Sequence, residues 1–498
     1  MILAKSDYML FLKHPAWLWL KKYDKSKLPP IDENLQARFD AGHDFENYAE
    51  RLFLEALKLG FNNYDEYKSL PNRTELALEE SDTILQGRFE VDGLTCIIDV
   101  LQKKESGKYN LIEIKSSSRA KPEHAYDLAF QTTVLQKYGL EIDEISVIHA
   151  NTDYVKKGEI NPKGITGKTD VTEDVKALLE ITEKQIHGAF EILNKNEMPD
   201  LSPRYVNQVG VSGTTWFADW MEVYNHLNPN IEKYSIYNLA YPNQEQIAEL
   251  EDSGIKYIQD IPEELALRDK QLAQIKTTKS GERIIDKDKI REFLETFEYP
   301  LYFFDYETLS SLIPAFDGMQ PYKDYPFQYS LHIQESLDAD VTHEEYLHLE
   351  PTNPMPGLLE KLKRDIGNKG SIITWNMSYE KGCNTKMAEF YPEYKEFLES
   401  LNKRIVDLMI PFSEMWFVDK DFFGSVSIKK VLPTLVPELS YKEMDVSDGL
   451  KARRMWTETI LEGKNEKQRE KIIDDLSKYC TLDTWAMVEI LGRLRKYV

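Results

Sequence analysis

Strand-like apolar segments occur in two separate parts of this chain, and their separation limits the folds open to it. In the first part, residues 95–101 (TCIIDVL) form a short apolar run, and residues 109–115 (YNLIEIK) follow a polar turn. In the second part, residues 299–305 (YPLYFFD) begin a new apolar strand. Helical patterns flank these runs, for example in residues 35–58. The pattern therefore predicts an α/β fold with two separate strand-rich domains.

The stretch between these two parts differs from both. It is helical and irregular, and it is interrupted by Pro203, Gly210, Gly213, Pro229 and Pro242. We predict an N-terminal domain over residues 1–197, a helical connector over residues 198–297 and a C-terminal domain over residues 298–498. A length of 498 residues agrees with this division, because one domain usually holds about 100–200 residues.

The charge balance limits how this protein can bind nucleic acid. Asp and Glu number 85 against 62 Lys and Arg, which gives a formal net charge of −23. Such a balance excludes the broadly basic surface of a protein that coats nucleic acid. An enzyme that acts on nucleic acid remains compatible with this charge if some of the acids bind cations locally.

The three cysteines are too few and too far apart for a disulfide framework or a CxxC metal site. We therefore expect a reducing, cytoplasmic location. The N-terminal segment is apolar but is interrupted by Lys5, Asp7, Lys13 and His14. Because no apolar run approaches the ~18 residues of a membrane span, we expect neither a signal peptide nor a membrane partner.

The first candidate site lies in the N-terminal part. Asp99 is in the apolar run CIID, and Glu113 and Lys115 follow in the strand LIEIK. Residues i and i+2 of a strand share a face, so Glu113 and Lys115 should project together, with Asp99 on a neighbouring strand. Paired carboxylates bind Mg²⁺ or Mn²⁺, and a lysine beside them can act on a water molecule. The alternative is a surface charge pattern that binds no metal.

This pattern resembles the RecB-like branch of the PD-(D/E)XK nucleases. In that branch a Gly is followed four residues later by a metal-site residue, which here is Glu46 after Gly42, and a later helix carries a Gln, here Gln131. The resemblance implies a restriction-endonuclease-like fold. It also implies that Glu46, Asp99 and Glu113 hold Mg²⁺ or Mn²⁺, that Lys115 acts on the attacking water, and that Gln131 positions the substrate backbone.

Many relatives in that branch also bind an iron–sulfur cluster through four cysteines. Here the first of these positions corresponds to His14, before Pro15, and residues 209–220 (VGVSGTTWFADW) contain no cysteine. Because thiolates hold such clusters, we expect no iron–sulfur cluster. We expect His14, Trp17 and Trp19 to pack in its place.

The second candidate site combines three segments of the C-terminal part. Asp305 and Glu307 stand at i and i+2 of the strand LYFFDYETL, on one face. Glu380 follows the segment ITWNMSY, and Tyr479 and Asp483 are four residues apart in a helical context, where they share a face. Spacing thus predicts two pairs that each share a face, Asp305 with Glu307 and Tyr479 with Asp483.

The order and spacing of these motifs resemble the DnaQ-like (DEDDy) exonucleases of the RNase H fold. The resemblance implies that Asp305, Glu307, Glu380 and Asp483 hold two divalent ions and that Tyr479 aligns a water molecule for 3′-5′ trimming. The family usually has Asp at the position of Glu380. Asp407 resembles a later, structural Asp of the family and is kept as a reserve ligand.

A RecB-like domain followed by a DnaQ-like domain resembles one family of bacterial proteins over nearly the whole chain. The resemblance implies a metal-dependent DNA nuclease with two hydrolytic sites, in DNA repair or in defence against foreign DNA. The alternatives are one active site, RNA as substrate, or a catalytically silent nucleic-acid-binding scaffold. Lys429 and Lys430 could contact phosphates or only solvate a loop. A protein partner and the oligomeric state stay open.

Overall fold

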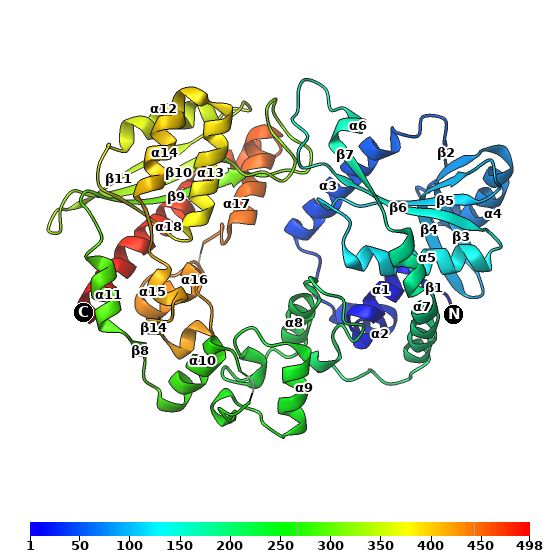
Figure 1. Ribbon diagram of the computed structural model, residues 1–498, viewed down its shortest axis with the longest axis horizontal. Coiled ribbons are helices and arrows are strands. Elements are labelled where there is room, and N and C mark those ends of the chain that lie inside the picture. The colour runs from blue at the N-terminus through cyan, green and yellow to red at the C-terminus, as the bar shows by residue number, and fades with distance from the viewer. Residues whose placement is uncertain (266, 443) are drawn as a thin grey trace. The chain divides into compact units, whose positions relative to one another are not determined.

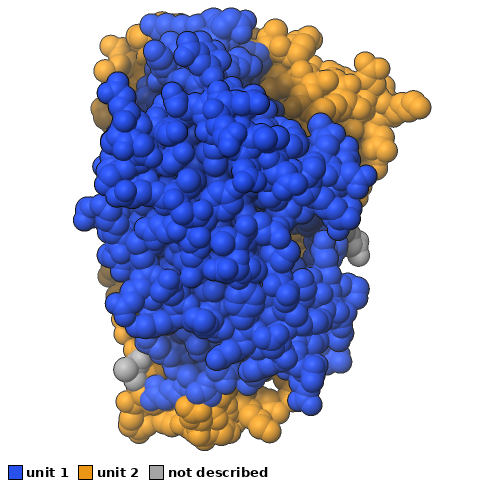
Figure 2. Space-filling model, turned by 90° about the vertical axis from the view of Figure 1, so that its right-hand side faces the viewer, with its two compact units in different colours: residues 1–231, 243–249, 312–322 blue, residues 232–242, 250–311, 323–498 orange. Residues whose placement is uncertain are grey.

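The computed structural model describes residues 1–265, 267–442 and 444–498 and has a mixed α/β fold, as the sequence predicted. The chain forms two compact units, coloured separately in Figure 2. The first unit contains residues 1–231, 243–249 and 312–322, and the second contains residues 232–242, 250–311 and 323–498. The segment expected as a connector, residues 198–297, is thus divided between the two units.

A mixed sheet organises the first unit (Figure 1). Its strand order is β2-β3-β4-β5-β6-β7, and β1 pairs with β4. The strands are β1 (Leu3–Ala4), β2 (Leu57–Lys58), β3 (Thr83–Val91), β4 (Leu94–Lys103), β5 (Tyr109–Ile114), β6 (Ile142–Ala150) and β7 (Thr166–Asp170). β4 and β5 are antiparallel with Val100 opposite Ile112, so Asp99 and Glu113 are the next residues along the two strands.

Helices connect and cover this sheet. Parallel strands need a crossover, and between β5 and β6 this crossover is α5, which packs on β3, β4 and β6 and against α7. The helices are α1 (Lys5–Lys13), α2 (Pro15–Tyr23), α3 (Glu33–Glu50), α4 (Tyr64–Glu80), α5 (Pro122–Lys137), α6 (Pro162–Ile165), α7 (Thr172–Leu193) and α8 (Trp216–Leu227), with α9 (Gln244–Asp252) shared between the units.

One core cluster of the first unit supports the candidate site. Phe45 and Ala49 of α3 pack on Val100 and Ile112 of the sheet, and Leu312 from the 312–322 segment joins the same cluster. Burial of such side chains contributes about 1.5–3 kcal/mol each. This packing fixes α3, and with it Glu46, beside the sheet.

His14 lies in a buried aromatic cluster of the first unit. Its ring stacks on Trp220 with 3.7 Å between centroids, and Trp17 also contacts Trp220. His14 Nδ1 accepts a hydrogen bond from the Ala16 amide (3.1 Å), so Nε2 carries the proton and donates to the Ser202 carbonyl (3.0 Å). The packing expected for His14 and Trp17 is thus present. Trp19 packs on Tyr23.

A second sheet, in the order β11-β10-β9-β12-β13, organises the second unit. β9, β10 and β11 are antiparallel neighbours, whereas β12 is parallel to both β9 and β13. The strands are β9 (Leu301–Leu309), β10 (Tyr325–Gln334), β11 (Val341–Leu347), β12 (Ser371–Thr374) and β13 (Ile405–Asp407), and a separate pair joins β8 (Ile284–Ile285) to β14 (Phe417–Val418). A Cβ on Gly370 would lie 2.2 Å from the Pro300 carbonyl oxygen, so this tight approach beside β12 requires glycine.

The helices of the second unit surround this sheet, and the long α18 contacts β9, β10 and β12. They are α10 (Asp269–Ser280), α11 (Lys287–Leu294), α12 (Met355–Asp365), α13 (Met377–Phe390), α14 (Lys395–Arg404), α15 (Ile410–Ser413), α16 (Ile428–Leu435), α17 (Gly449–Trp456) and α18 (Arg469–Tyr497). Across the part of the chain that the structure describes, every helix is too short or too polar to cross a membrane.

Candidate active sites

The first group of polar side chains in the first unit centres on Glu113 at the end of β5. Lys115 Nζ lies 2.6 Å from Glu113 Oε1, and Gln131 Nε2 donates to Glu113 Oε2 at 2.8 Å. Glu113 is only 1% exposed. The structure thus brings together the predicted residues Glu113, Lys115 and Gln131 from a strand, its following loop and the crossover helix.

Two further residues of this group were absent from the sequence prediction. Asp127 accepts hydrogen bonds from Lys115 Nζ (2.7 Å) and Gln131 Nε2 (2.9 Å), and Lys5 Nζ lies 2.8 Å from Glu113 Oε1. Asp127 could have been found, because it precedes Gln131 by four residues on one helix face. Lys5 is 108 residues from Glu113 and carries no such signal.

Asp99 joins the group through the backbone of β5. Its Oδ2 accepts a 2.7 Å hydrogen bond from the Ile114 amide. Burial and the nearby Glu113 raise the pKa of Asp99 well above its usual range. Burial also opposes ionisation of Glu113, but Lys115 and Lys5 outweigh it and lower the pKa of Glu113. Lys115 and Lys5 also lower the pKa of Asp127, so the group holds two ionised carboxylates, Glu113 and Asp127, beside Asp99, whose carboxylate makes no ion pair among the described residues.

Glu46 occupies the α3 side of this group. It accepts a hydrogen bond from Gln86, a β3 residue with a positive φ of 58° that the sequence did not single out. Burial raises the pKa of Glu46, and Glu50 and Glu113 add to this effect. Glu113 contributes to the raised pKa of both Glu46 and Asp99. Among the described residues, however, the carboxylate oxygens of these three predicted metal ligands do not all lie within 4.8 Å of one another.

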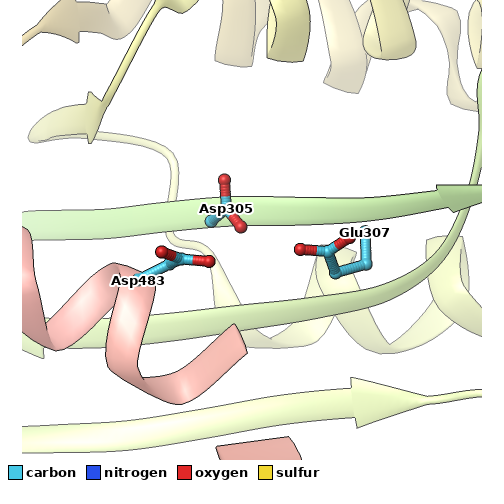
Figure 3. A group of neighbouring side chains, drawn as sticks. All are labelled: Asp305, Glu307 and Asp483. Carbon is cyan, nitrogen blue, oxygen red and sulfur yellow. The ribbon is translucent and has the colours of Figure 1, made fainter. Parts of the chain in front are cut away.

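The second group lies in the second unit and is the more compact set of carboxylates. Asp305 and Glu307 project from β9, and Asp483 projects from α18 toward them (Figure 3). Among the described residues, these three form the one set whose potential ligand oxygens all lie within 4.8 Å of one another. Carboxylate oxygens at this spacing fit Mg²⁺ or Mn²⁺. The predicted pairing of Asp305 and Glu307 with Asp483 is therefore present.

The pKa values of this second group show its excess of negative charge. Burial, reinforced by Asp483, raises the pKa of Asp305 well above its usual range and that of Glu307 to about 8. The pKa of Asp483 rises to about 6 through burial, although the hydrogen bond from Tyr441 and the nearby Lys429 lower it in part. A divalent cation would stabilise the ionised forms of all three acids.

Glu380 lies near this trio without joining it. It is in the first turn of α13, is 1% exposed, and adds to the raised pKa of Asp305. Burial raises the pKa of Glu380 itself to about 8. Its Oε2 is buried and has no hydrogen-bond partner in the part of the chain that the structure describes. An orphaned buried oxygen of this kind is a suitable ligand for a cation.

Asp407, the reserve ligand, has a structural position. Its carboxylate accepts hydrogen bonds from the amides of Asn376 (3.0 Å), Met377 (3.0 Å) and Met409 (2.9 Å). Asn376 has a positive φ of 73°, which asparagine tolerates better than most residues. Asp407 thus fixes the start of α13 and, through it, the position of Glu380.

Tyrosines and one lysine border the second group. Tyr479 and Asp483 are both buried on one face of α18, as their spacing predicted, and the Tyr479 ring lies 6.2 Å from that of Tyr441. Lys429 Nζ lies 5.3 Å from the Tyr479 ring centroid and donates to the Ser447 carbonyl at 2.6 Å. Lys429 also lowers the pKa of Asp483, whereas Lys430 lies over the ring of Phe423. Lys429 is therefore the lysine of this pair that faces the acids.

Part of the second unit is similar to a described family. Residues 302–427 match the family described as "Domain of unknown function (DUF2779)", and this segment includes Asp305, Glu307 and Glu380 but ends before Asp483.

Uncharacterized proteins of three bacteria are similar to part of the chain. The Ureaplasma parvum serovar 3 protein is 26% identical over 217 residues, or 39% of this chain and 31% of the relative. The Mycoplasma pneumoniae protein is 25% identical over 205 residues, and the Mycoplasma genitalium protein is 26% identical over 211 residues. Each of these two matches covers 38% of this chain and 31% of the relative, so the matched part is about a third of each relative's length. Their names assign them no activity.

Proposed function

We propose that this protein is a metal-dependent nuclease that hydrolyses phosphodiester bonds of DNA. The observation that carries the proposal is the convergence of Asp305, Glu307 and Asp483 within 4.8 Å, with the orphaned Glu380 carboxylate nearby. Several buried carboxylates with raised pKa values are costly to maintain without a cation. A divalent-ion site explains why they are retained together.

The arrangement of the second unit supports an RNase H-like fold and a DnaQ-like exonuclease site. Three antiparallel strands are followed by two parallel ones, and the acids stand on the first strand, an intermediate helix and the last helix. This is the distribution that the resemblance of the sequence implied. Glu380 in place of Asp adds one methylene, and its position outside the tight trio agrees with a looser second ligand.

In this site Asp305, Glu307, Glu380 and Asp483 would hold Mg²⁺ or Mn²⁺, and the bound ions would activate water and stabilise charge on the phosphate. Tyr441 orients Asp483 through a hydrogen bond, and Tyr479 lies on the same face of α18 as Asp483. The Tyr479 hydroxyl, beside Asp483, can also orient an incoming water. Lys429 supplies the positive charge that a phosphate oxygen requires at this edge of an otherwise acidic group.

For the first unit we propose a second hydrolytic site of the PD-(D/E)XK type, within a restriction-endonuclease-like fold. Asp99, Glu113 and Glu46 would hold the ion, Lys115 would act on the attacking water, and Gln131 would position the substrate backbone. The support is the contact of Lys115 and Gln131 with opposite oxygens of Glu113. Because Lys5 and Lys115 already contact Glu113 Oε1, an ion must share that carboxylate with them.

End-labelled DNA and RNA, single- and double-stranded, test the proposal with Mg²⁺, Mn²⁺ or EDTA. We expect metal-dependent cleavage of DNA, lost stepwise in Asp305→Asn and Asp99→Asn and abolished in the double variant. Asp474→Asn, an exposed change on the same helix as Asp483, and Asp143→Asn, an exposed change in the first unit, serve as matched controls. Faster cleavage of RNA than of DNA would show that the substrate is RNA and not DNA. The absence of cleavage in every condition would favour a nucleic-acid-binding scaffold instead.

A further inference from the structure

The ammonium group of Lys5 lies between two acids of the first group. Its Nζ is 2.8 Å from Glu113 Oε1 and 3.4 Å from Asp127 Oδ1. Lys115 contacts the same two side chains, at Glu113 Oε1 (2.6 Å) and Asp127 Oδ2 (2.7 Å). Two ammonium groups therefore share one Glu113 oxygen and engage different oxygens of Asp127.

The backbone fixes Lys5 at this place. Strand β1 pairs in parallel with β4, with Leu3 opposite Leu94, and the Leu3 amide donates to the Gly93 carbonyl at 2.8 Å. Lys5 is the first residue of α1, and the Ala4 amide donates to Asp7 in the first turn of that helix. The Lys5 side chain is only 23% exposed. It is thus held in the group from two sides and differs from a mobile surface lysine.

The charges of the group indicate what Lys5 does there. Four acids of the group, Glu46, Asp99, Glu113 and Asp127, lie around two ammonium groups, which leaves two negative charges when all four acids are ionised. Removal of Lys5 would leave three negative charges. It would also vacate a cation position that lies within 3.4 Å of one oxygen each of Glu113 and Asp127. Oxygen ligands of this kind and number suit a divalent ion.

We propose that Lys5 is a fixed cation that occupies a cation position between Glu113 and Asp127 and excludes a divalent ion from it. The inference rests on the metal chemistry proposed above for this group. On this inference, Glu113 and Asp127 can bind a divalent ion between them only when Lys5 is replaced. A tethered ammonium also stays in the site when free divalent ions are scarce, so one positive charge remains available to a phosphodiester.

The test counts Mn²⁺ ions bound to the full chain, by electron paramagnetic resonance of free Mn²⁺. The background carries Asp305→Asn and Glu307→Gln, which leaves only Asp483 of the three clustered acids of the second unit and so prevents that cluster from adding to the count. In this background Lys5→Met should bind one more Mn²⁺ ion per chain than the same chain with Lys5, and Lys5→Arg should bind the same number. An unchanged or lower number in Lys5→Met would overturn the inference.

Matched variants separate this effect from general changes in charge or folding. Lys21→Met removes an ion pair of 2.7 Å with Asp7 in the same part of the unit and should leave the count unchanged. Asp127→Asn added to Lys5→Met should cancel the gain. Circular dichroism checks folding, and Lys5→Gln carries the same expectation if Lys5→Met does not fold.

The result is independent of the cleavage assay. An additional ion without any cleavage by the parent chain overturns the proposed function and leaves this inference standing. Cleavage by the parent chain with no additional ion in Lys5→Met supports the proposed function and overturns this inference.

Discussion

The Tyr441 hydroxyl donates a 2.6 Å hydrogen bond to Oδ1 of Asp483, 42 residues further along the chain. Both side chains are buried, and Tyr479 lies on the same face of α18 as Asp483. Tyr441 therefore sets the orientation of a candidate metal ligand without itself being one. Residues that orient ligands in this way usually affect metal affinity by about 10–100-fold.

Tyr441→Phe should weaken Mn²⁺ binding to the second unit by about tenfold or more, because Asp483 loses a hydrogen bond that fixes its orientation. Isothermal titration of a chain that carries Asp99→Asn measures this affinity with the first group impaired. Tyr329→Phe is the matched control, since it removes a tyrosine–aspartate hydrogen bond of 2.5 Å to Asp365 in the same unit. Equal losses in the two variants would contradict the role given to Tyr441.

The raised pKa values in the second group predict an unusual dependence of stability on pH. Glu307 and Glu380 have a pKa near 8 in the folded chain, against about 4.5 when exposed. The folded chain thus binds more protons than the unfolded chain between these values, so the free energy of unfolding should fall as pH rises from about 5 to 8.

Thermal unfolding in EDTA measures this dependence. The parent chain should lose stability relative to Glu307→Gln across that pH range, by at least about 1 kcal/mol, since one pKa unit corresponds to about 1.4 kcal/mol. Mn²⁺ should reduce the loss because it binds the ionised carboxylates. Parallel pH curves for the parent and Glu307→Gln in EDTA would show that Glu307 ionises normally.

Asp407→Asn should destabilise the second unit more than the loss of an ordinary helix cap. Asp407 accepts from three backbone amides, whereas Asp286, at the start of α11, accepts from one, that of Lys289. A single cap contributes about 0.5–2 kcal/mol. We expect Asp407→Asn to exceed the effect of the control Asp286→Asn in urea denaturation. An equal or smaller effect would remove the reason for assigning Asp407 to structure.

His14→Leu tests the buried aromatic cluster of the first unit. Burial lowers the pKa of His14 to about 4, so the folded chain keeps it neutral while the unfolded chain takes up a proton below about 6.5. Stability from His14 is therefore present above pH 6.5 and is lost as pH falls toward 4. His14→Leu should lower the free energy of unfolding by about 1–3 kcal/mol at neutral pH, because it removes the two hydrogen bonds of the His14 ring.

The same variant should also show a weaker loss of stability between pH 6.5 and 4 than the parent chain. His187→Gln, an exposed histidine of α7, serves as the control and should unfold like the parent. A pH dependence identical in His14→Leu and the parent would assign the acid sensitivity of this unit to other groups.

Local patterns predicted a large part of the two candidate sites. Alternation along β9 placed Asp305 and Glu307 on one face, and helical spacing placed Tyr479 beside Asp483. The strand LIEIK likewise predicted that Glu113 and Lys115 project together, as their 2.6 Å contact shows. Each of these relationships lies within one strand or one helix. The side-chain period of that element, two residues in a strand and 3.6 in a helix, can be recognised in the sequence.

Contacts between distant segments required the tertiary structure. Lys5 meets Glu113 only because β1 pairs with β4, and Tyr441 meets Asp483 only because the chain before α17 returns to α18. Periodicity in the sequence does not predict such contacts, because they arise from strand pairing and from packing between elements that are distant in the chain.

Residue type and local spacing thus determined which acids of this chain could bind cations and which of them share a strand or helix. The tertiary structure alone decided how those acids are paired. It left Asp305, Glu307 and Asp483 close together without a lysine at hydrogen-bond distance among the described residues, while it placed two ammonium groups on Glu113. The physical reason is that burial makes each carboxylate depend on the nearest cation, and only the packing of distant segments determines which cation that is.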